Sequence, residues 1–405
     1  MVFPSKIFLS IFFVVLSSAD ASPLRPVAGK ATLSFTARVN ARGAVNIAAA
    51  DRARAQAMKQ AGSMGKRAGR SSFSITNAVV TYTAQVGVGS PATEYTLLID
   101  TGSSNTWLGA NTPYNPTITS VDTGNTVAVS YGSGSFSGEE YTDTVTLSAS
   151  LVIAGQSIGV ASNTEGFQDV DGILGVGPTD LTEGTISNVE TAPTVTDSLY
   201  SQGFIGTEAL GIYFVPTAAS DSAGELTFGG HDSSKTTSPV TYVPLTTTSP
   251  ASYYWGIDQS ISYGRSTILS ETAGIVDTGT TLVLIASDAF STYQTATGAV
   301  VDETTGLLMI TSSQYAKLQT LTFKIGSKTY DLIPNAQIWP RSLNADIGGS
   351  SDSIYLIVSD IGSDSGSGLD FINGYTFLQR HYSVFDATNN KVGFATTPYT
   401  DNTSN

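Results

Sequence analysis

The sequence predicts an all-β protein built from two related lobes and preceded by a basic segment of different character. From Ser71 onward, short segments rich in Val, Ile, Thr, Tyr and Phe alternate with Gly, Ser, Asn and Asp, a pattern typical of strands joined by turns. An apolar run ending in Asp-Thr-Gly occurs twice, at Asp100 and at Asp277. This repetition predicts a duplicated lobe with one carboxylate from each half. We expect an N-terminal lobe over residues 71–240 and a C-terminal lobe over 241–405.

The first 21 residues are predicted to be a secretory signal peptide. Lys6 precedes an apolar run over residues 7–16, and the small-residue pattern Ala19-Asp20-Ala21 follows. The run is too short to span a membrane stably. A buried N-terminal helix is the alternative interpretation. No later stretch has the length and apolar character of a membrane span, so we expect a secreted protein without a membrane anchor.

A sharp change in charge divides the rest of the chain. Residues 22–70 carry ten Lys and Arg against a single acidic residue, Asp51, for a net charge of +9, whereas residues 71–405 carry eight Lys and Arg against 31 Asp and Glu, for −23. Such a step marks segments with different roles. We interpret residues 22–70 as a basic propeptide, and the acidic body disfavours nucleic acid as a partner.

Within this basic segment, the Ala-rich stretch over residues 47–61 predicts a helix, because it contains no Gly or Pro. The dibasic pair Lys66-Arg67 on a Gly- and Ser-flanked linker predicts a processing site, with Arg70 as a second candidate. A solvated charged loop is the alternative for this stretch. In the body, we expect a short helix near residues 287–296 and a hairpin that turns at Asn389-Asn390.

The two Asp-Thr-Gly motifs are the candidate catalytic elements. Each follows a buried apolar run and precedes a hydroxyl residue, Ser103 or Thr280. Two carboxylates within hydrogen-bonding distance cannot both ionise, so the pair can hold one proton and act as general acid and general base on one water. A third Asp-Thr-Gly at Asp122 follows polar residues, and we interpret it as a surface turn.

Composition excludes several other chemistries. The chain has no cysteine, so disulfides, a cysteine nucleophile and thiolate metal sites are ruled out. The two histidines, His231 and His381, do not form a metal-binding pattern, and we interpret both as structural rather than as part of a serine triad. We therefore expect neither a metal nor a cofactor.

These residues together resemble the pepsin-like aspartic proteases, and most closely their cysteine-free fungal members of the polyporopepsin type. Residues 129–135 look like the flap hairpin of that family, and residues 171–175 look like the strand that supports the first catalytic loop. Residues 225–230 and 384–395 match landmarks of the second lobe. The resemblance covers the chain from about Ser71 and implies two β-barrel or sandwich lobes with an active-site cleft between them.

The resemblance also implies roles for individual residues. Thr101 and Thr278 would link the two catalytic loops, while Ser103 and Thr280 would bind the outer carboxylate oxygens. Tyr131 would close over the substrate, with its hydroxyl reaching Trp107. The full expected set comprises the catalytic Asp100 and Asp277, the supporting Thr101, Gly102, Ser103, Thr278, Gly279 and Thr280, and the substrate-binding Tyr131, Gly132, Ser133, Trp107, Ile173 and Thr281.

One motif departs from the family pattern. An apolar residue and an acidic residue are usual at the positions that Asn373 and Tyr375 occupy on either side of Gly374. A buried Asn costs about 1–3 kcal/mol unless its amide is hydrogen-bonded. The sequence leaves the geometry of this loop open.

The favoured function is a secreted acid endopeptidase, made as a zymogen, that acts on proteins and peptides as a monomer. The basic segment would fold back over the acidic cleft at neutral pH and leave it in acid. Apolar residues are expected on both sides of the scissile bond. One alternative is a non-catalytic protein of the same fold that binds extracellular protein or polysaccharide. A two-carboxylate glycosidase is a third possibility, which the symmetric Asp-Thr-Gly contexts disfavour.

Overall fold

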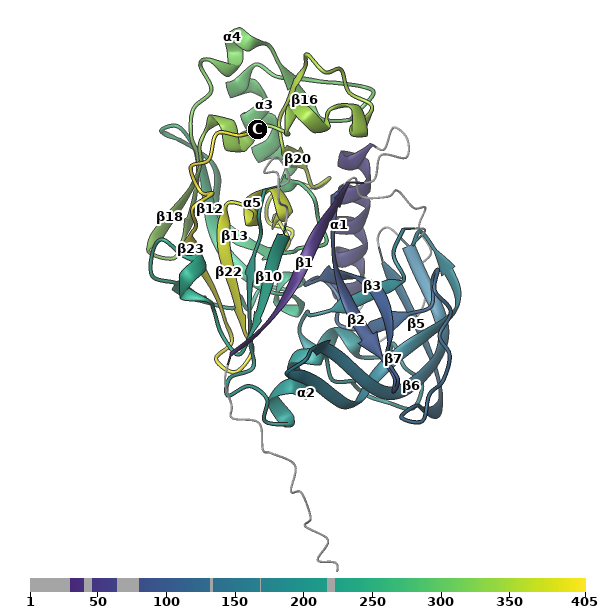
Figure 1. The fold of residues 1–405 in the computed structure, drawn as a ribbon. Helices are drawn as coiled ribbons and strands as arrows, with labels where there is room; N and C mark the ends of the chain where they lie inside the picture. Colours follow the sequence, from purple (N-terminus) through teal and green to yellow (C-terminus); the bar gives the residue numbers. More distant parts are fainter. Residues whose placement is uncertain (1–29, 40–45, 64–79, 132–133, 168, 217–222) are drawn as a thin grey trace, which may run out of the picture.

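A computed structural model of the protein describes residues 30–39, 46–63, 80–131, 134–167, 169–216 and 223–405. Figure 1 shows two β-rich regions with a single long helix, α1 (Ile47–Ser63), between them. The expected signal peptide, the Lys66-Arg67 and Arg70 processing sites, and the tip of the expected flap lie outside the described residues. The all-β, two-lobed fold is confirmed.

The larger sheet has 13 strands and includes strands from both ends of the described chain. Strands β22 and β23, close to the C-terminus, pair with β9 and β11, so the sheet continues across the boundary expected near residue 240. In spatial order its strands are β11 (Thr241–Pro244), β23 (Lys391–Thr396), β22 (His381–Asp386), β9 (Ala209–Tyr213), β10 (Ala223–Phe228), β1 (Ala31–Val39), β2 (Val80–Val88), β3 (Thr93–Asp100), β8 (Gly172–Gly175), β4 (Thr106–Leu108), β7 (Leu151–Glu165), β6 (Gly134–Ser148) and β5 (Val121–Tyr131).

Two smaller sheets build the rest of the second lobe. The seven-stranded sheet runs in the order β18 (Lys328–Leu332), β17 (Leu321–Ile325), β12 (Gly256–Tyr263), β13 (Ser266–Val276), β21 (Phe371–Asn373), β14 (Val283–Ile285) and β20 (Val358–Asp360). The three-stranded sheet consists of β15 (Val300–Val301), β16 (Leu308–Ile310) and β19 (Ile354–Tyr355). A continuous core of buried apolar side chains joins the two lobes.

The strand pairing repeats between the lobes, as the duplicated motif predicts. In the first lobe β3 runs parallel to β8, which pairs antiparallel with β4, and β4 in turn runs parallel to β7. In the second lobe β13, β21, β14 and β20 repeat this arrangement of directions. Asp100 ends β3, and Asp277 directly follows β13. Each carboxylate is therefore carried by an equivalent buried strand.

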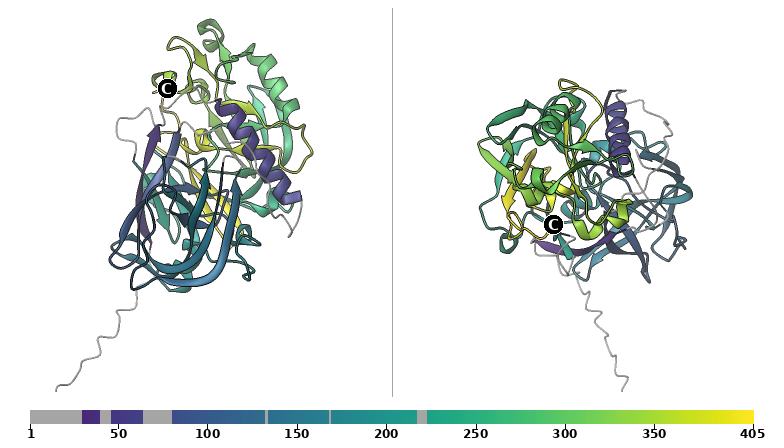
Figure 2. Two further views of the ribbon diagram at one scale, coloured as in Figure 1. Left: turned by 90° about the vertical axis from the view of Figure 1, so that its right-hand side faces the viewer. Right: turned by 90° about the horizontal axis from the view of Figure 1, so that it is seen from above.

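The basic segment is an integral part of this architecture. The expected helix is confirmed as α1, and its buried side chains recur at Ile47, Asp51, Arg54 and Met58, the spacing of a single helical face. Figure 2 shows α1 lying across the molecule between the two lobes. The sequence prediction missed the strand β1, which inserts between β10 and β2. Its side chains alternate between buried and exposed from Thr32 to Thr36, as a half-buried strand requires.

The remaining helices are short. The helix expected near residues 287–296 is confirmed as α3 (Ser287–Thr297), and the expected hairpin is formed by β22 and β23, with Asn390 at a φ of 50° in the turn. The other α-helices are α2 (Val195–Ser201), α4 (Ser312–Tyr315) and α5 (Tyr375–Leu378). Single 3₁₀ turns occupy Thr179–Thr182, Ser233–Lys235, Ala251–Tyr253, Pro334–Gln337, Arg341–Leu343 and Ala345–Ile347. None of the helices in the described part of the chain is long and apolar enough to cross a membrane.

Candidate active site

The structure brings the two Asp-Thr-Gly loops face to face where the lobes meet. Asp100 and Asp277 are both fully buried. Oδ1 of Asp100 accepts a hydrogen bond from the Gly102 N–H (2.9 Å), and its Oδ2 accepts one from the Ser103 hydroxyl (2.6 Å). The Asp277 carboxylate is held in the same manner, by the Gly279 N–H (3.1 Å) and the Thr280 hydroxyl (2.6 Å). The expected hydroxyl contacts at the outer oxygens are thus present.

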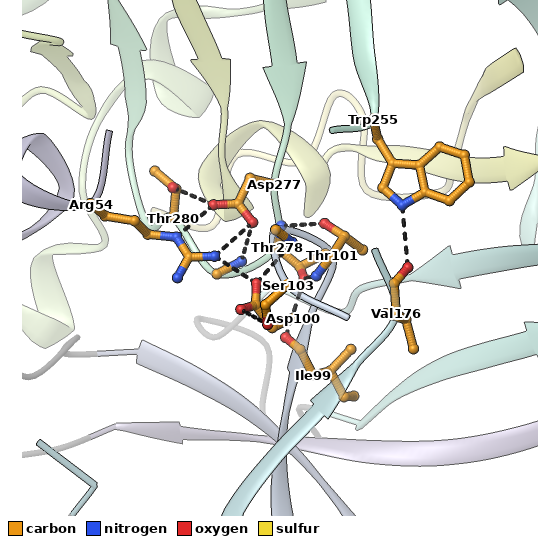
Figure 3. Close-up of polar contacts among 12 residues, drawn as sticks. Arg54, Ile99, Asp100, Thr101, Ser103, Val176, Trp255, Asp277, Thr278 and Thr280 are labelled. Atoms are coloured by element: carbon orange, nitrogen blue, oxygen red, sulfur yellow. Dashed lines mark hydrogen bonds and ion pairs between the residues drawn. The ribbon is translucent and has the colours of Figure 1, made fainter. Parts of the chain in front are cut away.

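The two loops are cross-linked by Thr101 and Thr278, as expected. The backbone N–H of each threonine donates to the hydroxyl of the other, at 3.0 and 2.9 Å. The Thr278 hydroxyl also donates to the carbonyl of Ile99 at 3.1 Å (Figure 3). These reciprocal bonds fix the distance between the loops, so the two carboxylates are held in a rigid frame.

The glycines of the two motifs allow this close approach. A Cβ atom at Gly102 would lie 2.6 Å from Asp277 Oδ1, and one at Gly279 would lie 2.6 Å from Asp100 Oδ1. Any side chain there would push the opposing carboxylate away. Only glycine is therefore compatible with two carboxylates in this arrangement.

Arg54 of helix α1 lies directly between the two carboxylates (Figure 3). Its Nη2 contacts Asp100 Oδ1 at 2.6 Å and Asp277 Oδ1 at 3.1 Å, and its Nε contacts Asp277 Oδ2 at 2.8 Å. The Arg54 side chain is only 8% exposed. The guanidinium thus occupies the space in which a reacting group would have to lie.

The electrostatics of the three groups are strongly asymmetric. Burial and the neighbouring Asp277 raise the pKa of Asp100, and Arg54 only partly offsets them. Burial also acts to raise the pKa of Asp277, but the charge and hydrogen bonds of Arg54 outweigh it and hold that pKa below its usual value. Burial acts to lower the pKa of Arg54, but the two carboxylates outweigh burial, and the pKa is raised overall. Arg54 therefore stays charged and stabilises Asp277 as the carboxylate.

Asp51, one turn earlier on the same face of α1, is a second buried contact of the helix. Its Oδ2 accepts a hydrogen bond from the Leu282 N–H at 2.7 Å, next to the second catalytic loop. Burial raises the pKa of Asp51 to about 7, although the backbone hydrogen bonds and Arg54 act in the opposite direction. Asp51 is therefore protonated in the packed helix below about pH 7.

In the loop that departs from the family pattern, the buried side-chain amide forms hydrogen bonds with a second side-chain amide. Asn373 is fully buried, and its Nδ2 donates to Gln259 Oε1 at 2.8 Å, while Gln259 Nε2 donates back to Asn373 Oδ1 at 3.1 Å. The carbonyl of Asn373 also accepts from the Asp277 N–H at 3.2 Å. Tyr375 begins α5, and its hydroxyl donates to Gln379 at 2.7 Å. The polar substitutions thus leave the support of the catalytic loop intact.

We expect Asn373→Leu and Gln259→Leu each to lower the free energy of unfolding by about 1–3 kcal/mol, because each leaves the other amide buried and unpaired. The double variant should lose less than the sum of the single losses, since no orphaned amide remains. Urea unfolding of the four proteins measures this. Strictly additive losses would show that the two amides do not depend on each other.

Two of the expected substrate-binding residues form an aromatic pair beside the first catalytic loop. Tyr131 and Trp107 are both buried, and their rings stack with centroids 6.5 Å apart. Their Oη and Nε1 atoms, however, have no hydrogen-bond partner among the described residues. Burial raises the pKa of Tyr131, while hydrogen bonding from Trp107 acts to lower it, so the expected bond between the two side chains stays a prediction. Gly132 and Ser133 lie outside the described residues.

Two other expected substrate-binding residues lie near the loops, and the groups interpreted as non-catalytic lie elsewhere. Ile173 packs in the apolar cluster around Trp107, and Thr281 is buried beside the second loop. Asp122 is exposed in an irregular part of β5, where its Oδ1 accepts from the Gly124 N–H at 2.8 Å. Both ring nitrogens of the buried His381 lack a hydrogen-bond partner within the described residues, and burial lowers its pKa to about 3. The described residues contain no group of side chains suited to a metal ion.

Paired Asp-Thr-Gly loops at the junction of two equivalent β lobes define the class of the pepsin-like aspartic proteases. The chain belongs to the eukaryotic aspartyl protease family, whose model matches residues 81–397. It is 64% identical to polyporopepsin from Irpex lacteus over 334 residues, which cover 82% of this chain and 98% of that protein. It is 32% identical to gastricsin from Cavia porcellus over 335 residues, or 78% of this chain and 80% of that one.

A solved structure supports the same assignment. The crystal structure of the aspartic proteinase from Irpex lacteus matches with a TM-score of 0.78 and 64% identity, covering 80% of this chain and 96% of that chain. The protein is an aspartic-type endopeptidase, and its substrates are proteins or peptides.

Sequence reasoning missed three residues that the structure places at or near the site. Arg54 and Asp51 could have been proposed from their spacing, because both lie on the apolar face of the predicted helix. Trp255, whose Nε1 donates to the Val176 carbonyl at 3.2 Å (Figure 3), carried no comparable signal. Its partner lies 79 residues away in the chain.

Proposed function

We propose that the chain is the precursor of a secreted, monomeric acid endopeptidase, and that residues 22–70 inhibit it until they are removed. The observation that carries this proposal is the position of Arg54, which bridges Asp100 and Asp277 and excludes a water or a substrate from between them. The signal-like N-terminus supports secretion.

With Arg54 withdrawn, the two carboxyl groups would hold the water that attacks the peptide bond. One carboxylate takes a proton from this water while the water oxygen bonds to the scissile carbonyl carbon. The other, protonated, carboxyl donates its proton to the carbonyl oxygen. Collapse of the resulting diol, with proton transfer to the amide nitrogen, releases the two peptide products. The Ser103 and Thr280 hydroxyls orient the outer oxygens throughout.

The cleft wall near the first loop favours apolar residues on either side of the scissile bond. Tyr131, Trp107, Phe136 and Ile173 belong to a single buried apolar cluster there. Burial of an apolar substrate side chain against such a wall is favourable by about 25 cal/mol per Å² of apolar surface. The remaining members of the expected set, Gly132 and Ser133, would approach the substrate from the flap.

Acid is the proposed signal for release of α1. The pKa of Asp277 is depressed while Arg54 contacts it, so this contact stabilises the closed state above the usual pKa of an aspartate, about 3.9, and the stabilisation is lost as the pH falls through the depressed value. Asp51 acts in the opposite sense. Because the pKa of Asp51 is raised, this side chain stabilises the closed state most in acid, where it is protonated. That stabilisation weakens as the pH rises toward 7 and above. Asp100, whose pKa burial also raises in the closed state, acts in the same sense as Asp51. Among these three buried carboxyl groups, the Asp277–Arg54 contact is the one that weakens in acid, and we propose that its loss contributes to release.

We expect protein comprising residues 22–405 to remain intact and inactive at about pH 7, and to shorten to a product beginning near residues 68–71 at about pH 3.5. Mass spectrometry follows the chain length, and digestion of denatured haemoglobin with and without pepstatin follows the activity. Pepstatin-sensitive activity should appear only after acidification. Equal activity at both pH values with residues 22–70 still attached would contradict the inhibitory role.

A further inference from the structure

The edge of the cleft beside α1 carries a binding site for a basic side chain. Arg52 extends from α1 to Asp360 at the end of β20, where its Nη2 lies 3.2 Å from Asp360 Oδ2 and its Nε donates to the Asp360 carbonyl at 3.1 Å. One residue thus supplies two acceptors to two different guanidinium nitrogens. This geometry fits the planar fork of arginine better than the single ammonium group of lysine.

The acceptors are held in place by the enzyme body rather than by α1. Asp360 Oδ1 accepts from the Ser287 hydroxyl at 2.6 Å and from the Gly362 N–H at 2.8 Å. Oδ2 has no hydrogen-bond partner except Arg52 within the described part of the chain. Departure of α1 would therefore leave an oriented carboxylate oxygen on the surface that α1 covers, with its position already fixed.

The loop after β20 is fixed by further carboxylates. The Asp288 carboxylate accepts from the Ser365 N–H (3.1 Å) and hydroxyl (2.6 Å), and the buried Asp370 accepts from the N–H groups of Gly366 (2.6 Å) and Ser367 (2.9 Å). These bonds leave little freedom for the loop to collapse when α1 leaves. The negative charges also add to the attraction for a cation.

The loop provides space for the stem of the arginine as well. Gly362 has a φ of +88°, and a Cβ atom there would lie 3.1 Å from Arg52 Cδ and 3.2 Å from its Cγ. Lys59, two turns further along α1, donates to the hydroxyls of Ser363 and Ser367 on the same loop. The loop therefore binds two separate cationic side chains of α1.

We propose that, in the mature enzyme, Asp360 forms a subsite that selects substrates with an arginine some residues away from the scissile bond. This inference rests on the proposed removal of α1 from the cleft. In the precursor, Arg52 would then occupy the position that a substrate arginine takes in the mature enzyme.

The topology limits where that arginine lies along the substrate. Asp360 pairs with Ile285 in the parallel strands β20 and β14, five residues beyond Thr280 of the catalytic loop. Five residues of extended chain span at most about 18 Å. An extended substrate rises about 3.3–3.6 Å per residue, so the arginine lies up to about five positions from the cleaved bond.

The test uses acid-activated enzyme and internally quenched peptides that share an apolar scissile pair. Each peptide carries arginine at one position, two to five residues before or after the cleaved bond, and is matched to a peptide with neutral, isosteric citrulline there. Assays at about pH 5 keep an ordinary aspartate ionised. We expect kcat/KM at one position to be about fivefold higher for arginine than for citrulline, the size of a partly exposed ion pair, with lysine between them.

Asp360→Asn should abolish this preference while citrulline peptides are cleaved as by the wild type, because the asparagine oxygen can still accept from Ser287 and Gly362. Asp364→Asn is the matched control, since it removes an exposed carboxylate from the same loop and should keep the preference. An arginine-to-citrulline ratio near one at every position, or a ratio that survives Asp360→Asn, overturns the subsite. Failure to cleave any peptide, whether it carries arginine or citrulline, would instead refute the proposed function, and the subsite with it.

Discussion

Replacement of either Asp100 or Asp277 by asparagine is expected to lower kcat by more than about 1,000-fold. The reaction needs one proton shared between two carboxyl groups, and an amide can neither accept the proton of the water nor replace the missing acid. The fold should survive, because Asn retains one carbonyl oxygen and can accept the hydrogen bonds of Ser103 or Thr280 in part. Both variants should therefore unfold cooperatively, at temperatures close to that of the wild type.

Because an inactive variant cannot process itself, the precursor would be cut at neutral pH by trypsin, which is then inhibited before acidification. Hydrolysis of a quenched peptide at about pH 3.5 gives kcat. Asp122→Asn is the matched control, since it removes the same group from an exposed Asp-Thr-Gly and should keep full activity. An Asp122 variant as inactive as Asp100→Asn, or an Asp277 variant with substantial turnover, would refute the assignment.

Replacement of Arg54 by alanine should destabilise the closed precursor by about 3–5 kcal/mol, because it removes the partner of two fully buried carboxylates. This corresponds to a shift of about 10²–10⁴-fold in the equilibrium between closed and open states. Processing should then proceed at pH values at which the wild type stays intact, and the difference should be largest near neutral pH. In stronger acid the carboxyl pair takes up a proton, so the loss of Arg54 matters less.

The measurement is the rate of chain shortening by mass spectrometry at a series of pH values. Arg52→Ala provides the matched control, because it removes the same charge from the same helix but breaks a bridge in which Arg52 is 41% exposed. Such a bridge is worth about 0–1 kcal/mol, so processing should change by at most about fivefold. Equal pH thresholds for Arg54→Ala and the wild type would show that Arg54 is not the inhibitory contact.

The sequence was informative wherever structure depends on neighbouring residues. Asp100 and Asp277 were identifiable because the apolar strand, the Thr-Gly turn and the following hydroxyl are contiguous in the chain. The helix α1 was predictable from composition alone, whereas the separate role that the charge step predicts for its segment stays a prediction. The two lobes followed from repetition of the motif.

Features that depend on distant partners were not predictable. The buried amide of Asn373 has its hydrogen-bond partner in Gln259, 114 residues away, and no local pattern links the two. The position of Arg54 on the apolar face of the helix was readable from its spacing, but its partners Asp277 and Asp100 lie 223 and 46 residues away, and no local pattern shows that it contacts them. The Tyr131–Trp107 bond stays a prediction, because the family resemblance describes pairings of side chains but not the rotation of each ring.

The strand β1 and the Arg54 contact are expected to respond differently to acid. The Arg54 contact responds to protons, whereas β1 is held by backbone ladders to β10 and β2, and these hydrogen bonds do not titrate. If the segment is cut as we propose, opening of the dyad and departure of the cut segment would therefore have different controls. Since β1 is interior to the 13-stranded sheet, its loss would expose two bare strand edges, which are prone to intermolecular pairing. While it is in place, β1 therefore covers both of these edges and joins β10 and β2 into one sheet.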